Sequence, residues 1–175
     1  MPLKLKVKSD GKETVYERKE EPMLANLIDA LKVQRLEIEM YSDPKKPPTD
    51  EQNTKHIKLM AEFAARFWGE GLTADDILNG VSAEEGFEQI SSGIAQTLNM
   101  SADDDDESED KNQKKITVEM VDDSINKLND YIKSQLENGY KWGEISKLTL
   151  GDLRLMSYVF EERTTTIDKA FPFLF

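Results

Sequence analysis

Apolar and lysine residues alternate over residues 3–8, which read LKLKVK. A period of two predicts a strand with one buried face. Asp10-Gly11 follows, a pair that favours a tight type I′ turn, and residues 14–16 suit a return strand. We therefore expect an N-terminal hairpin that packs on other elements, because an isolated hairpin is only marginally stable in water.

After Pro22, the spacing of the apolar residues changes from that of a strand to that of a helix. Proline is favoured at the first helical position. The first helix is predicted to reach about Met40. A second begins at Thr49, which forms a capping box with Gln52. Its broad apolar face comprises Ile57, Met60, Ala61, Ala64, Phe67 and Trp68.

Two further helix starts follow the glycines at 69 and 71. Thr73 with Asp76 is predicted to cap a short helix that carries Ile77 and Leu78. Ser82 with Glu85 predicts another capping box. The next helix bears Phe87, Ile90, Ile94 and Leu98 on one face and contains Gly86 and Gly93, which would allow close packing against a neighbour.

Residues 101–110, SADDDDESED, carry seven acidic residues and no basic one. Such a run repels itself and is typical of a solvated linker. After it, a helical stripe comprises Val121, Ile125, Leu128, Ile132 and Leu136. Trp142 to Lys147 is predicted as a short helix or turn, and Thr149 with Asp152 opens a last helix.

The predicted fold class is therefore mainly α with a short N-terminal β hairpin, as two small helical domains joined by an acidic linker. The predicted boundaries are residues 1–100 for the first domain, 101–115 for the linker and 116–175 for the second domain.

The net charge of −12 disfavours nucleic acid and anionic membranes as partners. No stretch approaches the length of a membrane span, and residues 1–10 lack the apolar region of a signal peptide. The absence of cysteine excludes disulfides and thiolate chemistry. We expect a protein of the cytoplasm.

No catalytic residue, metal site or cofactor site is predicted. His56, the single histidine, has no evident partner and is best interpreted as a partly packed residue on a helix surface. The acidic run lacks the glycine of a calcium-binding loop. The C-terminal FPFLF, residues 171–175, either folds back onto the C-terminal helices or docks on a partner.

The stretch from Ala61 to Leu98 resembles the tail assembly chaperones of long-tailed phages and prophages. The resemblance lies in the order of a helix with an aromatic end, a capped short helix, its stop and a final amphipathic helix. These are Phe67-Trp68-Gly69, Leu72-Thr73-Ala74-Asp75-Asp76, Asn79-Gly80 and residues 82–98.

A second stretch, Asn138 to Met156, resembles the C-terminal extension of the long form of these chaperones. That form is often made by programmed ribosomal frameshifting, and Lys114-Lys115 lies near the expected junction. The terminal FPFLF departs from the family pattern. The matching residues are Gly139, Trp142, Glu144, Ile145, Leu150 and Leu153.

The resemblance implies a non-catalytic factor of virus tail assembly, acting in the host cytoplasm and absent from the mature virion. Its N-terminal domain would hold the tape measure protein soluble through Phe63, Phe67, Trp68, Phe87, Ile90 and Ile94. Its extension would recruit the major tail tube protein through Trp142, Glu144, Ile145, Leu150 and Leu153. Self-association stays open.

Two other functions stay open on the sequence. The Asp-rich run would be the active surface of a small acidic regulator that mimics DNA. A minor structural tail protein would be found in purified virions.

Overall fold

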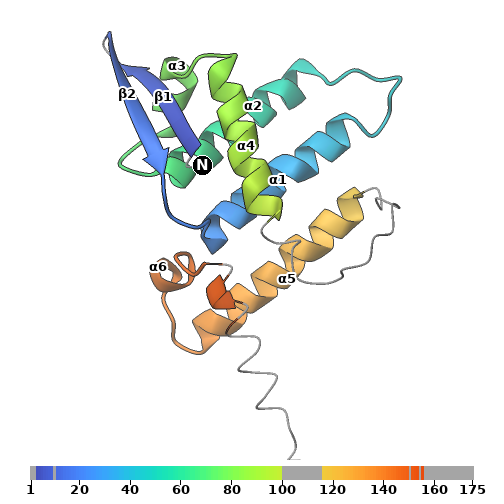
Figure 1. Cartoon of the computed structure of the whole chain (residues 1–175). Coiled ribbons are helices and arrows are strands. Elements are labelled where there is room, and N and C mark those ends of the chain that lie inside the picture. Colours follow the sequence, from blue (N-terminus) through green and yellow to red (C-terminus); the bar gives the residue numbers. More distant parts are fainter. Residues whose placement is uncertain (1–2, 10, 100–115, 150, 154, 156–175) are drawn as a thin grey trace, which may run out of the picture.

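The computed structural model describes residues 3–9, 11–99, 116–149, 151–153 and 155. It is mainly helical with an N-terminal two-stranded antiparallel hairpin, which confirms the predicted fold class (Figure 1). The elements are β1 (Leu3–Ser9), β2 (Lys12–Arg18), α1 (Leu24–Met40), α2 (Asp50–Trp68), α3 (Ala74–Gly80), α4 (Glu85–Asn99), α5 (Val118–Glu137) and α6 (Trp142–Ile145).

The hairpin has the predicted register and one buried face. Ser9 pairs with Lys12, and Gly11 in the turn between them has a φ of +75°, which a glycine adopts without strain. Leu5 and Val7 are 0% and 4% exposed. They face α3 and α4, which supply the packing that a lone hairpin needs (Figure 1).

The first core lies among the hairpin, α1, α2, α3 and α4. Gly93 of α4 faces this core, and a Cβ there would lie 3.4 Å from the rings of Phe63 and Phe67. The glycine therefore allows α4 to approach α2 closely, as predicted. The buried members are Leu5, Val7, Ala30, Val33, Met60, Ala61, Phe63, Ala64, Phe67, Trp68, Ile77, Ile90 and Ile94.

The second core lies on another face of α1, where α5 and α6 pack (Figure 1). Its buried members are Leu24, Leu27, Leu31, Val121, Ile132 and Ile145. Helix α1 therefore contributes to both cores and joins the N-terminal part to residues 116–149. The domain boundaries predicted from the sequence stay a prediction, and this contact lies between the two predicted domains.

Most predicted helix starts are confirmed by hydrogen bonds. The Thr49–Gln52 and Thr73–Asp76 capping boxes are formed. Helix α4, by contrast, begins at Glu85 rather than at Ser82. The carbonyl of Ser82 still accepts from the backbone N–H of Gly86 at 3.0 Å, and the carboxylate of Glu85 lies 3.3 Å from Lys6 Nζ of β1.

The stripe predicted on α5 also needs one correction, because Leu136 is 45% exposed and Gln135 is buried in its place. The chain turns away directly after the end of α5, at Asn138 and Gly139, where φ of the glycine is +93°. Leu136, in the last turn of α5, therefore lies on the solvent side of the helix. Thr149 and Asp152 form the predicted capping hydrogen bonds.

Candidate partner-binding surfaces

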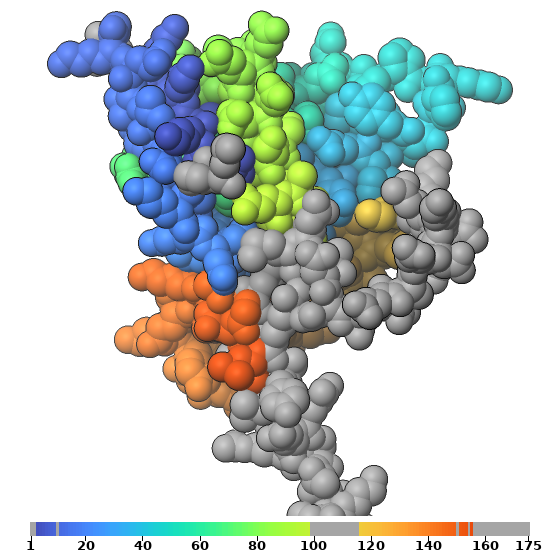
Figure 2. All heavy atoms as spheres, in the orientation of Figure 1, coloured from blue at the N-terminus to red at the C-terminus, as the bar shows by residue number. Residues whose placement is uncertain are grey.

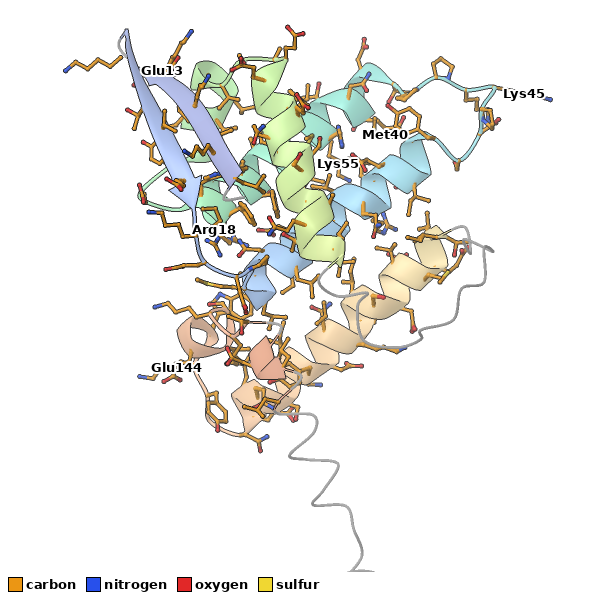
Figure 3. All side chains as sticks on the ribbon, in the orientation of Figure 1. Glu13, Arg18, Met40, Lys45, Lys55 and Glu144 are labelled. Atoms are coloured by element: carbon orange, nitrogen blue, oxygen red, sulfur yellow. The ribbon has the colours of Figure 1, made fainter. Side chains whose placement is uncertain are left out.

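An aromatic cluster fixes the end of α2 against the hairpin. The Phe63 and Phe67 rings stack with centroids 5.1 Å apart, and Trp68 meets Phe67 edge-on at 4.8 Å. Trp68 Nε1 donates to the carbonyl of Leu3 at 3.2 Å. The Arg18 guanidinium lies 4.9 Å from the Phe67 ring centre, a cation–π contact at the end of β2 (Figure 3).

Arg18 also donates to the carbonyl of Phe67. Burial lowers the pKa of Arg18, and the nearby charge of Glu20 opposes that shift. An arginine held in this way positions α2 relative to the hairpin, and hence places the apolar residues described next.

An apolar groove opens between α2, α3 and the start of α4; we call it the α2–α4 groove. Its cavity measures about 130 Å³. The residues at its rim include Ile57 and Leu78, which are 40% and 42% exposed. The lining residues are Ile57, Met60, Ala61, Ile77, Leu78, Val81, Ser82, Ala83, Phe87 and Ile90.

Only two of the six residues predicted to bind the tape measure protein line this groove, namely Phe87 and Ile90. Ile90 is buried at its base and Phe87 is half-buried. The other four, Phe63, Phe67, Trp68 and Ile94, lie in the first core and are between 0% and 7% exposed. In this structure, these four side chains stabilise the packing of α2 and α4, which form two walls of the groove.

Ile57 and Leu78 are two exposed groove residues that the sequence alone did not single out as partner contacts. Both belong to apolar helical faces, so periodicity found them. Periodicity does not distinguish a residue at the centre of such a face from one at its rim, where solvent or a partner reaches it.

A second apolar surface lies at α6, with a cavity of about 160 Å³ lined by Gln135, Tyr140, Glu144, Ile145 and Leu148. We call it the α6 surface and count with it Trp142, the first residue of α6, which does not line the cavity. Tyr140 and Trp142 are 54% and 48% exposed. Exposed aromatic side chains beside an apolar depression are characteristic of protein-binding surfaces.

The residues predicted to contact the tail tube protein are distributed unevenly around this surface. Trp142 and Glu144 are exposed, and Glu144 is on α6 (Figure 3). Glu144 also accepts a hydrogen bond of 2.8 Å from the backbone N–H of Lys141, so it caps α6. Ile145 is buried and Leu153 half-buried, whereas Leu150 lies outside the described residues.

The space-filling view places the residues of α6 directly below the start of α1 (Figure 2). The backbone N–H groups of Leu24 and Ala25 donate to the carbonyls of Leu148 and Ser146, at 2.7 and 3.3 Å. The first N–H groups of a helix lack partners within the helix, and these carbonyls satisfy two of them. The α6 surface is thereby anchored to the N-terminal part of the molecule.

His56 has a partner that the sequence did not reveal. Its Nε2 lies 2.8 Å from a carboxylate oxygen of Glu37, and its side chain is 18% exposed. The pair links α2 to α1, which agrees with the interpretation of His56 as a partly packed surface residue.

Within the described ranges, no group of three or more histidine, aspartate or glutamate side chains is arranged to hold a metal ion. None of the helices described there is both long and apolar enough to cross a membrane. The acidic run at 101–110 and the FPFLF segment lie outside those ranges.

Comparison with known families gives a match over the part of the chain that contains the hairpin and helices α1 to α4. The sequence model of the family described as phage tail chaperone protein matches residues 1–116. Searches of curated proteins and of solved structures gave no match. The family match spans well over half of the 175 residues, and the chain therefore belongs to the phage tail chaperone family.

Proposed function

We propose that this tail assembly chaperone holds the tape measure protein through its α2–α4 groove and recruits the major tail tube protein through its α6 surface. Family membership gives the general role, a non-catalytic factor that interacts with tail proteins. The observation that carries the finer assignment is the presence of two separate apolar surfaces, one inside the family match and one beyond it.

The groove suits an amphipathic helix. Ile57, Leu78 and Phe87 present apolar side chains from three helices around one depression. A long helical protein that has not yet assembled exposes an apolar stripe, which aggregates in water. A helix laid into such a groove buries that stripe, a common mode of peptide recognition.

The α6 surface is suited to a second partner. Tyr140 and Trp142 project from the segment that follows α5. Aromatic side chains contribute most to binding when they lie at the centre of an interface, where a partner excludes water from them.

The family match ends at residue 116, two residues before α5 begins. This supports the interpretation of residues 116–175 as the extension of a long form, with frameshifting as its proposed origin. We also propose that the protein works in the host cytoplasm and leaves the tail before the virion is complete.

Co-expression with the phage's own tape measure and tube proteins tests the assignment. We expect tagged full-length protein to retain both in the soluble fraction. Leu78→Asp should lower recovery of the tape measure protein by about tenfold or more, because a charge replaces an apolar contact worth roughly 1.5–3 kcal/mol. Trp142→Ala should lower recovery of the tube protein only.

Val15→Asp is the matched control, since Val15 is 52% exposed on the hairpin and touches neither surface. It should leave both recoveries unchanged. Failure of the wild type to retain either protein would overturn the proposed function and favour the acidic-regulator hypothesis. Equal losses from Leu78→Asp and Val15→Asp would overturn the assignment of the groove.

A further inference from the structure

Helix α1 carries a second apolar face that is covered by α5. Leu24, Leu27 and Leu31 recur at helical spacing and are 0%, 5% and 8% exposed. Helix α5 lies along them and contributes Val121 and Ile132 to the shared core (Figure 1). The face of α1 is therefore a surface that already accommodates an amphipathic helix.

The apolar stripe of α5 is buried less completely than that of α1. Val121 and Ile132 are 2% and 9% exposed, but Ile125 and Leu128 between them are only half-buried. Since the free energy gained scales with the apolar area removed from water, these two half-buried side chains contribute less to holding α5 on α1 than fully buried ones would.

Among the described residues, one cluster of ion pairs also attaches the N-terminal half of α5 to α1. Arg35 of α1 binds both carboxylate oxygens of Asp122, and its Nη1 also lies 3.3 Å from Glu39. The Arg35 and Asp122 side chains are 39% and 41% exposed. Water screens a pair at this exposure, so its contribution to stability is small.

The C-terminal end of α5 is attached differently. Beyond Gly139, the chain from Ser146 to Leu148 is fixed to the start of α1 by two backbone hydrogen bonds, and Thr149 forms a β-bridge with Met23. Helix α5 is thus an arm joined at Gly139 to an anchored segment. Its release from α1 requires no break in those backbone contacts.

We propose that the α1 face formed by Leu24, Leu27, Leu31 and Arg35 is a helix-binding site whose resident occupant, α5, is exchanged for an amphipathic helix of an unassembled tail protein. The incoming helix would carry apolar residues at the spacing of Val121, Ile125, Leu128 and Ile132, with an acidic residue beside the first. This inference rests on the proposed function and adds a site distinct from the α2–α4 groove.

The exchange is tested on full-length protein with a fluorescent peptide of residues 117–138, which reproduces α5. Asp122→Arg places a cation beside Arg35 and weakens the resident helix. We expect peptide binding, followed by anisotropy, to strengthen by about three- to tenfold relative to the wild type, because an attraction is replaced by a repulsion.

Asp123→Arg is the matched control. It makes the same charge change one residue further along α5, where Asp123 pairs with Lys127 of the same helix at 2.8 Å and both side chains are exposed. It should strengthen binding by less than about twofold, since only an exposed pair within the helix is lost.

Reversed pairing locates the peptide on the protein. An Arg35→Asp protein should prefer a peptide carrying Asp122→Arg to the wild-type peptide, and the wild-type protein should show the opposite preference. The inference would be overturned by equal binding to all the proteins, by absence of that reversal, or by no binding to the Asp122→Arg protein.

Hydrogen exchange gives a readout that does not depend on the variants. Saturating peptide should reduce protection of residues 118–137 in the wild-type protein while α2 stays protected. Because the peptide derives from this chain, the test of exchange requires no tail protein. Failure of exchange is therefore distinguishable from failure of the proposed function, which is measured by retention of tail proteins. If exchange occurs, a helical fragment of the tape measure protein should compete with the peptide; no competition would overturn the tail protein as its partner.

Discussion

At the residue scale, the aromatic side chains near the end of α2 maintain the fold, and smaller apolar residues form the accessible rim of the groove. Phe63 is 0% exposed and stacks on Phe67, whereas Ile57 is 40% exposed. Both lie on α2 and have similar hydrophobicity. Burial separates their roles, because only an exposed side chain can gain free energy from contact with a partner.

Phe63→Ala should therefore destabilise the protein by roughly 3–5 kcal/mol, since it leaves a cavity in a close-packed core. Urea unfolding followed by circular dichroism measures the change. Ile57→Ala, on the same helix, should cost less than about 1 kcal/mol. Similar losses for the two variants would contradict the placement of Phe63 at the centre of the first core.

At the element scale, helices α2, α3 and α5 each begin after a threonine whose side chain accepts a hydrogen bond from an otherwise unpaired backbone N–H. Asp76 Oδ2 accepts hydrogen bonds from both the hydroxyl and the backbone N–H of Thr73, at 2.6 and 2.9 Å. The side-chain hydrogen bond with Thr73 lowers the pKa of Asp76 below its ordinary value of 3.8, and the backbone hydrogen bond adds to the shift. The start of α3 thus depends on an ionised carboxylate.

This dependence predicts a pH effect. Because the pKa of Asp76 is lower in the folded state, its contribution to stability is complete above the unfolded pKa and is lost as pH falls through the folded pKa. Asp76→Asn should lower the melting temperature at pH 6, and the difference from wild type should shrink progressively as the pH falls below the ordinary pKa of 3.8. Thermal melts over a series of pH values from 6 downward measure this.

Asp75→Asn is the control for that experiment, since Asp75 is exposed in the same helical turn and is not the capping-box residue. Its smaller effect should come from the helix dipole alone. A difference between Asp76→Asn and wild type that did not shrink as the pH was lowered would contradict the role of the ionised carboxylate in the cap.

At the scale of the whole molecule, α1 connects two cores. Ala30 and Val33 face the first, and Leu24, Leu27 and Leu31 face the second. A helix with so little polar surface cannot lie on one side of a small domain, because the remaining apolar face would be exposed to water. The packing of α5 on α1 follows from that constraint.

A substitution that destabilises one core should leave the other core largely folded. Val121→Asp introduces a charge at the 2%-exposed contact between α5 and α1. We expect hydrogen exchange to show lost protection over residues 118–137, with α2 retaining most of its protection. Equal loss in α2 would show that the cores unfold as one cooperative unit.

Local patterns predicted most of the elements, but only part of the candidate sites. The Thr49 and Thr73 caps involve residues three positions apart, so the sequence contains both partners of each interaction. Other contacts join residues from different elements. These are the Glu37–His56 pair, the groove rim at Leu78 and the Arg35–Asp122 contact. No local pattern encodes which helices become neighbours.

The sequence by itself therefore determined the hairpin, the helix starts and the apolar faces, because strand and helix periods and capping interactions act over a few residues. Only the tertiary structure decided which of those apolar residues are buried. It placed Phe63 in the core, left Ile57 and Trp142 accessible, and laid α5 on α1. The physical reason is that burial depends on neighbours brought together by the whole fold, and each apolar face has several possible partners until the chain has packed.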